Sequence, residues 1–138
     1  ECNRRSWCNN GFYQALPAHI RTLVKPVNKL TSAGLEDSTI QTTSDYVFLP
    51  SEIEVYGYIT CSFEGEGTIY SYFNKGASYR YKSPNDDTSI LSMSNWWWER
   101  SPWIHDVGEF CCVCDENENA PTSTYSADWI GIAPAFCI

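Results

Sequence analysis

Hydrophobic residues at the start of the chain recur with the spacing of a helix. Between Cys8 and Leu16 they stand at i, i+4, i+7 and i+8, which predicts a short amphipathic helix. Pro17 suits the first turn of a second helix, and Pro26 ends it. Residues 31–45 are polar and rich in Thr and Ser, which indicates a loop or an exposed ribbon. The first third therefore predicts two short helices followed by a polar connection.

Short apolar runs between turn residues predict strands in the rest of the chain. Residues 46–49 form one candidate for a buried strand. Ser51 and Glu54 match a capping box, which predicts one or two helical turns that Gly57 ends. The other strand candidates are residues 59–63, 68–73, 96–98, 109–114 and 129–132, with 135–138 as a last pairing segment. This order of elements favours the α+β class.

Length and composition bound the architecture. At 138 residues the chain can bury one core, so we expect a single domain over residues 1–138. A hydrophobic fraction of 43% and an aromatic fraction of 15% favour a packed globule over a disordered chain. The chain does not begin with Met, and we expect it to be the C-terminal part of a longer protein.

Charge is distributed unevenly along the chain, and this distribution limits the classes of partner that the chain can bind. The formal net charge is −8, and six acidic residues but no Lys or Arg follow Arg100. A nucleic-acid surface needs a cluster of Lys and Arg, so we expect no nucleic-acid partner. The apolar runs are far shorter than the ~20 residues that span a bilayer, so we expect no membrane insertion.

The cysteine pattern leaves two interpretations open. Seven cysteines make an odd count, and a chain of this size builds a core without bridges, which favours mostly reduced thiols. Cys111 and Cys114 have C-x-x-C spacing, which would suit a metal or redox centre. A strand would point these two thiols to opposite faces, one packed in the core and one exposed. We therefore predict no metal site and no cofactor.

Aromatic residues gather in the C-terminal segment. Five of the six tryptophans lie between Trp96 and Trp129, among short polar loops. Trp and Tyr offer a large contact area at a small cost in ordering entropy. This segment therefore predicts a recognition surface.

Four motifs in this order carry a resemblance to a known family. They are Leu49-Pro50-Ser51-Glu52-x-Glu54-Val55-x-Gly57, Trp97-Trp98-x-Arg100-Ser101-Pro102, Phe110-Cys111-x-Val113 and Gly131-Ile132-Ala133-Pro134-Ala135-Phe136. The chain from about residue 49 to 138 resembles a bacterial and phage domain family of unassigned function, known by its Trp-Trp-x-Arg-Ser-Pro signature. The resemblance implies a C-type-lectin-like fold with two N-terminal helices, short and mostly antiparallel strands and long loops. That fold is similar to the variable proteins of diversity-generating retroelements.

The resemblance also divides the residues by role. It assigns the motif positions to the scaffold and the positions between them to ligand contact, where a retroelement could diversify them. The predicted ligand-contacting residues are Trp103, His105, Asp106, Cys112, Cys114, Asp115, Asn117, Asn119, Thr124, Tyr125, Asp128 and Trp129. Glu99 stands where such domains carry an apolar residue, and we expect it to alter the surface beside the site. Arg100 is expected to pair internally with a carboxylate.

These features predict a non-enzymatic binding module. The resemblance implies a receptor-binding or adhesive tip on a phage tail or bacterial surface, extracellular or virion-associated, with a protein or glycan ligand on a cell. A homo-oligomer within a larger assembly would fit this role. One alternative is a formylglycine-generating-type oxidase with copper on two of Cys111, Cys112 and Cys114. Another is a calcium-dependent lectin that uses Asp115, Glu116, Asn117 and Asn119.

Overall fold

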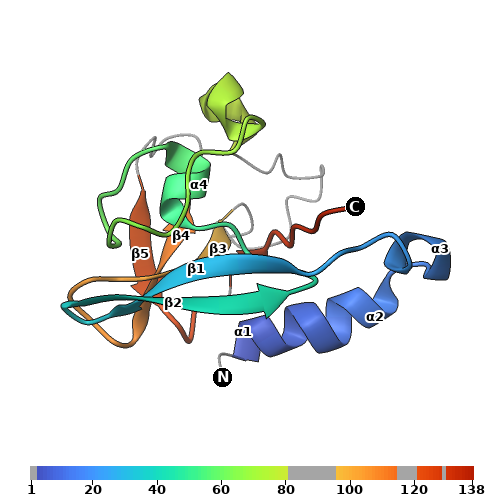
Figure 1. Ribbon diagram of the computed structural model, residues 1–138. Coiled ribbons are helices and arrows are strands. Elements are labelled where there is room, and N and C mark those ends of the chain that lie inside the picture. The colour runs from blue at the N-terminus through green and yellow to red at the C-terminus, as the bar shows by residue number, and fades with distance from the viewer. Residues whose placement is uncertain (1–2, 81–95, 115–120, 129) are drawn as a thin grey trace, which may run out of the picture.

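A helical rod begins the chain and packs along the rest of the molecule (Figure 1). The computed structural model describes residues 3–80, 96–114, 121–128 and 130–138. The rod consists of α1 (Asn3–Ser6), the π-helical η1 (Trp7–Phe12) and α2 (Tyr13–Ala15), and α3 (Ala18–Arg21) follows after Pro17. Both predicted N-terminal helices are therefore present, the first longer than expected.

Asn9, in the π-helical turn, fastens the rod to the segment that follows the second strand. Its side-chain oxygen accepts hydrogen bonds from the backbone N–H groups of Tyr46 (2.9 Å) and Val47 (3.3 Å). Its amide nitrogen donates to Asp45 Oδ1 and to the carbonyl oxygen of Val47, both at 3.0 Å. One side chain thus satisfies backbone groups that no sheet neighbour reaches.

The polar segment predicted as a loop or ribbon is a β-hairpin. Strand β1 (Val27–Gly34) pairs antiparallel with β2 (Asp37–Asp45). Gly34 has φ = +80°, and a Cβ there would lie 2.9 Å from the Cβ of Pro102, so only glycine fits without movement. The ribbon interpretation is confirmed, and its tip is held against the second sheet.

The capping box is confirmed atom by atom. Ser51 Oγ accepts from the Glu54 N–H (3.4 Å), and Glu54 Oε2 accepts from the Ser51 N–H (3.0 Å). They begin α4 (Glu52–Tyr56), which Gly57 ends in the left-handed conformation. The 3₁₀ turns η2 (Phe73–Lys75) and η3 (Ala77–Tyr79) follow further along the chain.

The C-terminal strands form a four-stranded sheet in the order β5-β4-β3-β6. The strands are β3 (Trp97–Pro102), β4 (Glu109–Val113), β5 (Thr122–Tyr125) and β6 (Gly131–Ile132). Neighbouring strands are antiparallel except β3 and β6, which are parallel. The described chain is therefore a mixed α+β fold with two sheets of mostly antiparallel strands.

Adjacent tryptophans of β3 anchor two separate cores, because successive side chains of a strand point to opposite faces. Trp98 packs with Cys8, Val47, Leu49 and Cys112. Trp97 packs in a second cluster, with Val55, Tyr56 and Val113. Both tryptophans are buried, in agreement with their predicted scaffold role.

Three predicted strands need correction, and one strand was not predicted. Residues 59–63 and 68–73 contain no strand, and residues 46–49 make only an isolated bridge, between Phe48 and Ala135. Residues 122–125, expected in a polar loop, form β5 at the sheet edge. The predicted C-terminal pairing segment is confirmed by that bridge and by one between Lys25 and Cys137. None of the described helices is long and apolar enough to cross a membrane.

Candidate functional site

A buried ion-pair network joins two of the sequence motifs. Arg100 of β3 forms an ion pair with Glu54 of α4, and Lys29 Nζ of β1 lies 2.5 Å from the other oxygen of that carboxylate. Arg100 also donates to the carbonyl oxygens of Leu30, Leu49 and Glu66. The predicted internal role of Arg100 is confirmed, so this cation holds the scaffold together.

These contacts shift the pKa values of Glu54 and of Lys29. Burial opposes ionisation of Glu54, but the hydrogen bond and charge of Arg100 outweigh it and lower the pKa of this carboxyl. Burial lowers the pKa of Lys29 despite its bond to Glu54. The network is thus held by a firmly ionised carboxylate.

Two further glutamates of the interior organise backbone. Glu52 accepts hydrogen bonds from the backbone N–H groups of Thr60 (2.7 Å), Cys61 (3.0 Å) and Ser62 (2.7 Å). Glu66 accepts from the N–H and hydroxyl of Ser32 on β1 and from the hydroxyl of Ser101 on β3. Both carboxylates therefore connect, through hydrogen bonds, segments that do not belong to the same sheet.

Glu99 differs from the other buried glutamates because neither of its oxygens has a hydrogen-bond partner among the described residues. The side chain is 1% exposed, so the expectation that it alters a surface is wrong. Burial and the nearby charges of Glu52, Cys61 and Glu66 raise the pKa of Glu99 well above its usual range, against the effect of Arg100. Glu99 therefore occupies an interior position that favours its neutral form over the carboxylate.

The predicted ligand-contacting residues separate into distinct groups. Cys112 and Cys114 are fully buried, so they offer a ligand no surface, and the expectation that one face of this strand is exposed is wrong. Thr124 donates to the Asp128 carboxylate within the molecule. Asp115, Asn117, Asn119 and Trp129 lie outside the described residues. The remaining candidates are Trp103, His105, Asp106 and Tyr125.

These four candidates meet at one end of the sheet, where the β3–β4 turn faces the end of β5. Glu109 pairs with Tyr125, and the N–H of Ser126 donates to the carbonyl oxygen of Gly108 at 2.7 Å. The rings of Trp103 and His105 contact edge to face at 5.5 Å between centroids. Asp106 accepts the Gly108 N–H at 2.6 Å, which closes the turn. The structure therefore brings together this part of the predicted site.

The turn of the β1–β2 hairpin completes the same end of the molecule. The N–H groups of Leu35 and Glu36 donate to the carbonyl oxygens of Trp103 (3.4 Å) and Ile104 (2.8 Å). Leu35 and Glu36 have φ of 46° and 60°, a left-handed conformation that is costly for residues other than glycine. We call the surface formed by Leu35, Trp103, His105, Val107 and Tyr125 the aromatic tip.

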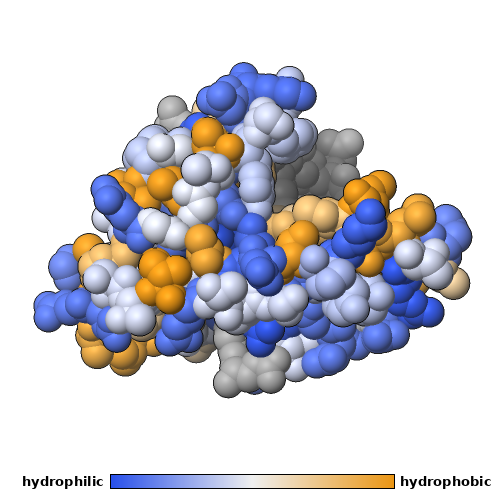
Figure 2. All heavy atoms as spheres, in the orientation of Figure 1, coloured by the Kyte–Doolittle hydropathy of each residue, from blue (hydrophilic) through white to orange (hydrophobic). Residues whose placement is uncertain are grey.

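The aromatic tip is exposed and apolar. Val107 is 74% exposed, Tyr125 60% and Leu35 51%. Figure 2 shows hydrophobic side chains at the left end of the molecule, over the hairpin turn and the β3–β4 turn. The sequence did not indicate a role for Leu35, because Leu-Glu is not a usual hairpin turn and only Gly34 signalled a bend.

The predicted site does not form a single patch within the described chain. Cys114 and Pro121, which flank residues 115–120, lie at the end of β4 opposite to the aromatic tip. The four residue steps from Glu109 to Val113 separate the two ends by about 13 Å, at ~3.3 Å per residue. Cys114, a described member of the predicted site, therefore lies apart from the aromatic tip.

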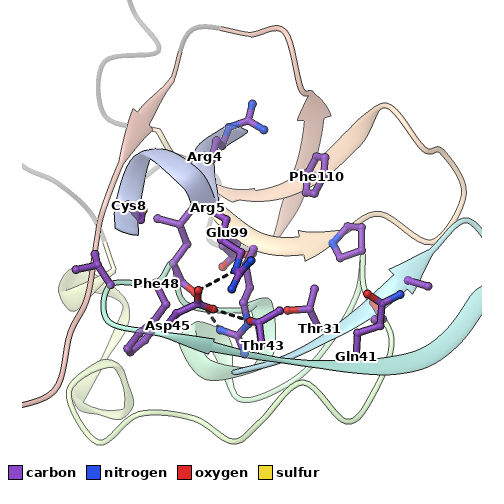
Figure 3. Close-up of a pocket in the computed structure, with 16 residues that line it drawn as sticks. Arg4, Arg5, Cys8, Thr31, Gln41, Thr43, Asp45, Phe48, Glu99 and Phe110 are labelled. Atoms are coloured by element: carbon purple, nitrogen blue, oxygen red, sulfur yellow. Dashed lines mark hydrogen bonds and ion pairs between the residues drawn. The ribbon is translucent and has the colours of Figure 1, made fainter. Parts of the chain in front are cut away.

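A cavity of about 340 Å³ lies between the N-terminal rod, the hairpin and β3 (Figure 3). Figure 3 shows Arg4 and Phe110 on one side of it and Thr31, Thr43 and Gln41 of the hairpin on the other. The apolar wall includes Val47, Phe48, Leu49 and Phe110. No pattern in the sequence signalled this cavity, because its lining comes from five separate segments.

Comparison with known proteins identifies the family. The whole chain, residues 1–138, matches a family described as a domain of unknown function (DUF6273). The chain belongs to this family. No curated protein and no solved structure matches it.

Most described thiols of this DUF6273 domain are packed in the interior. No disulfide joins the six described cysteines, which agrees with the predicted mostly reduced state, and of these six only Cys137 is exposed. Cys111 lies 3.9 Å from a Glu52 oxygen. Burial raises the pKa of the Cys112 thiol, which disfavours the thiolate that a soft metal ion needs. Among the described residues, no group of three or more His, Cys, Asp or Glu is placed to hold a metal ion.

Proposed function

We propose that this DUF6273 domain is a non-enzymatic binding module that contacts its ligand through the aromatic tip. The observation that supports this most directly is the exposure of Leu35, Val107 and Tyr125 on a backbone tied together by hydrogen bonds. Side chains on a backbone that is already ordered cost less entropy on binding than those on a segment that must first be ordered. A contiguous surface of this kind favours contact with a protein or with the apolar face of a sugar.

The left-handed residues at the hairpin turn strengthen the proposal. Two consecutive non-glycine residues with positive φ cost about 1–2 kcal/mol each, and natural chains retain such strain mainly at functional sites. Here the strain presents Leu35 beside Trp103. A rigid tip at the cost of some stability is expected of a recognition surface.

We further propose that the fold is C-type-lectin-like and that the ligand is a protein or glycan on a cell surface. Support for the fold comes from the antiparallel bridges between the C-terminal segment and the N-terminal half, at Lys25–Cys137 and Phe48–Ala135. A receptor-binding or adhesive domain on a phage tail or bacterial surface fits a rigid tip carried on a braced scaffold.

Binding of the labelled domain to a glycan array and to intact bacterial cells tests the proposal. Trp103→Ala and Tyr125→Ala should each reduce binding by at least about tenfold, which corresponds to ~1.4 kcal/mol. The matched control is Tyr72→Ala, because Tyr72 is 55% exposed but lies beside η2, away from the aromatic tip. Undiminished binding by both tip variants, with melting temperatures unchanged, would contradict this placement.

A further inference from the structure

The cavity beneath the hairpin carries more positive charge than the chain as a whole. Three arginines, Arg4, Arg5 and Arg100, line it with the acids Asp45 and Glu99. Arg5 is paired with Asp45 at 2.7 Å, and Arg100 is paired with Glu54. Asp45 also accepts hydrogen bonds from Asn9 and Thr43, so its charge is already satisfied by the protein.

Arg4 is the cation in this cavity that no described carboxylate neutralises. Its guanidinium carbon lies 3.8 Å from the centroid of the Trp98 ring and 5.6 Å from that of Phe110. Its Nη2 donates to the carbonyl oxygen of Ser126. Stacking on Trp98 orients the planar group while it leaves N–H donors for a further acceptor.

Size and lining fit a small organic molecule. A volume of about 340 Å³ is in the range of small-ligand sites, which are mostly apolar with a few placed polar groups. Phe110 and Phe48 supply flat apolar wall, and Thr31 and Thr43 supply hydroxyl groups. Glu99 also lines the cavity, and its burial without a hydrogen-bond partner among the described residues favours the neutral form, which would not repel an anion.

We propose that this cavity binds a small organic anion with a flat apolar body, whose acid group lies on Arg4 and whose body packs against Phe110. A guanidinium binds a carboxylate or a phosphate ester through paired N–H donors, so the two acid groups share this chemistry. The site is separate from the aromatic tip. The domain therefore carries an internal small-molecule site in addition to its exposed binding surface.

Titration of the whole chain with benzoate, phenyl phosphate and benzamide tests this site, with the indole N–H resonance of Trp98 as the readout. Benzoate or phenyl phosphate should shift this resonance at millimolar concentration. The anion that binds more tightly identifies the acid group that the site prefers. Benzamide has the shape of benzoate without its charge and should bind at least about tenfold more weakly. Equal affinity for benzamide and benzoate, or no binding by either anion, would overturn the proposal.

Variants locate the site independently of the ligand series. Arg4→Met keeps a long side chain over Trp98 but removes the charge, and it should weaken anion binding by about tenfold or more. Arg21→Met is the matched control, because the Arg21 side chain donates only to Gln14 among the described residues. Ala33→Phe should fill the cavity and abolish binding without a change in charge. Wild-type affinity in a folded Arg4→Met or Ala33→Phe domain would exclude this site.

Discussion

Arg100 of β3 and Glu54 of α4 form a buried ion pair that joins the second signature motif to the first. Each partner is held by a second contact on the hairpin, because Lys29 also binds Glu54 and the Leu30 carbonyl accepts from Arg100. Three elements distant in sequence are therefore locked through one carboxylate. The same brace fixes the start of the hairpin whose far end forms the aromatic tip.

Removal of Arg100 should strongly destabilise the fold. Arg100→Met leaves the buried Glu54 charge with only Lys29, and we expect a loss of about 3–5 kcal/mol in the free energy of unfolding. Arg100→Lys should cost nearly as much, because one ammonium group cannot reach the carbonyl oxygens of Leu30, Leu49 and Glu66 together. Urea denaturation measures both changes, with Arg21→Met as the control, because the Arg21 side chain donates only to Gln14 among the described residues. A stable Arg100→Lys variant would show that charge alone is sufficient.

Glu99 should make stability depend on pH in a direction opposite to most carboxyl groups. The folded protein keeps this proton above the ordinary glutamate pKa of 4.5, whereas the unfolded chain loses it there. Folding then takes up a proton, so stability falls as pH rises, by up to about 1.4 kcal/mol per pH unit. Glu99→Gln removes this dependence.

The test for Glu99 compares how steeply the stability of the wild type and of Glu99→Gln changes with pH, rather than how stable each protein is at one pH. Urea midpoints measured between about pH 5 and pH 7 should show the variant gaining on the wild type as pH rises. Parallel pH profiles of the two proteins would mean that Glu99 is ionised in the fold.

Glu52→Ala should release the segment that its carboxylate holds. Three backbone N–H groups, those of Thr60, Cys61 and Ser62, lose their acceptor. Each buried unpaired group costs about 1–3 kcal/mol, and Cys61 and Ser62 are buried, so the total loss should reach about 2 kcal/mol or more. Hydrogen exchange should accelerate at these amides, and the matched control Glu64→Ala, an exposed residue nearby, should leave them protected. Unchanged exchange at residues 60–62 would contradict the role given to Glu52.

The hairpin turn offers a test that separates stability from binding. Leu35→Asn with Glu36→Gly supplies residues that tolerate positive φ, and the double variant should gain about 1 kcal/mol or more in stability. It also removes an apolar side chain of the aromatic tip, so cell binding should fall. Ser38→Gly, at an exposed position of β2, should instead lose about 0.5–1 kcal/mol. A double variant without added stability would mean that the turn is not strained.

Local signals explain which elements the sequence predicted correctly. The capping box at Ser51 and the glycine stop at Gly57 act within a few residues, and the structure contains both. Residues 59–63 have the apolar pattern of a strand, but the Glu52 carboxylate takes three of their N–H groups. β5 was missed because its Thr and Ser residues carry no apolar face, and pairing with β4 makes it a strand.

The residues of the candidate site were also predicted only in part. Trp103, His105, Asp106 and Tyr125 were predicted from a resemblance and meet at one end of the sheet, whereas Cys112 and Cys114 are buried because both faces of β4 are covered. Leu35 is part of the site because hydrogen bonds hold the hairpin turn against the β3–β4 turn, a contact that the sequence did not indicate.

By itself the sequence determined the α+β class, the capped helix, the buried tryptophan pair and the internal role of Arg100, since these depend on periodicity, short-range capping and the cost of an unpaired buried charge. The tertiary structure alone decided that Glu99 is buried in the interior, that the hairpin turn belongs to the aromatic tip, and that a cavity lies beside Arg4. Each of these depends on which distant segments pack together, and packing sets the solvent and the neighbours that a side chain meets.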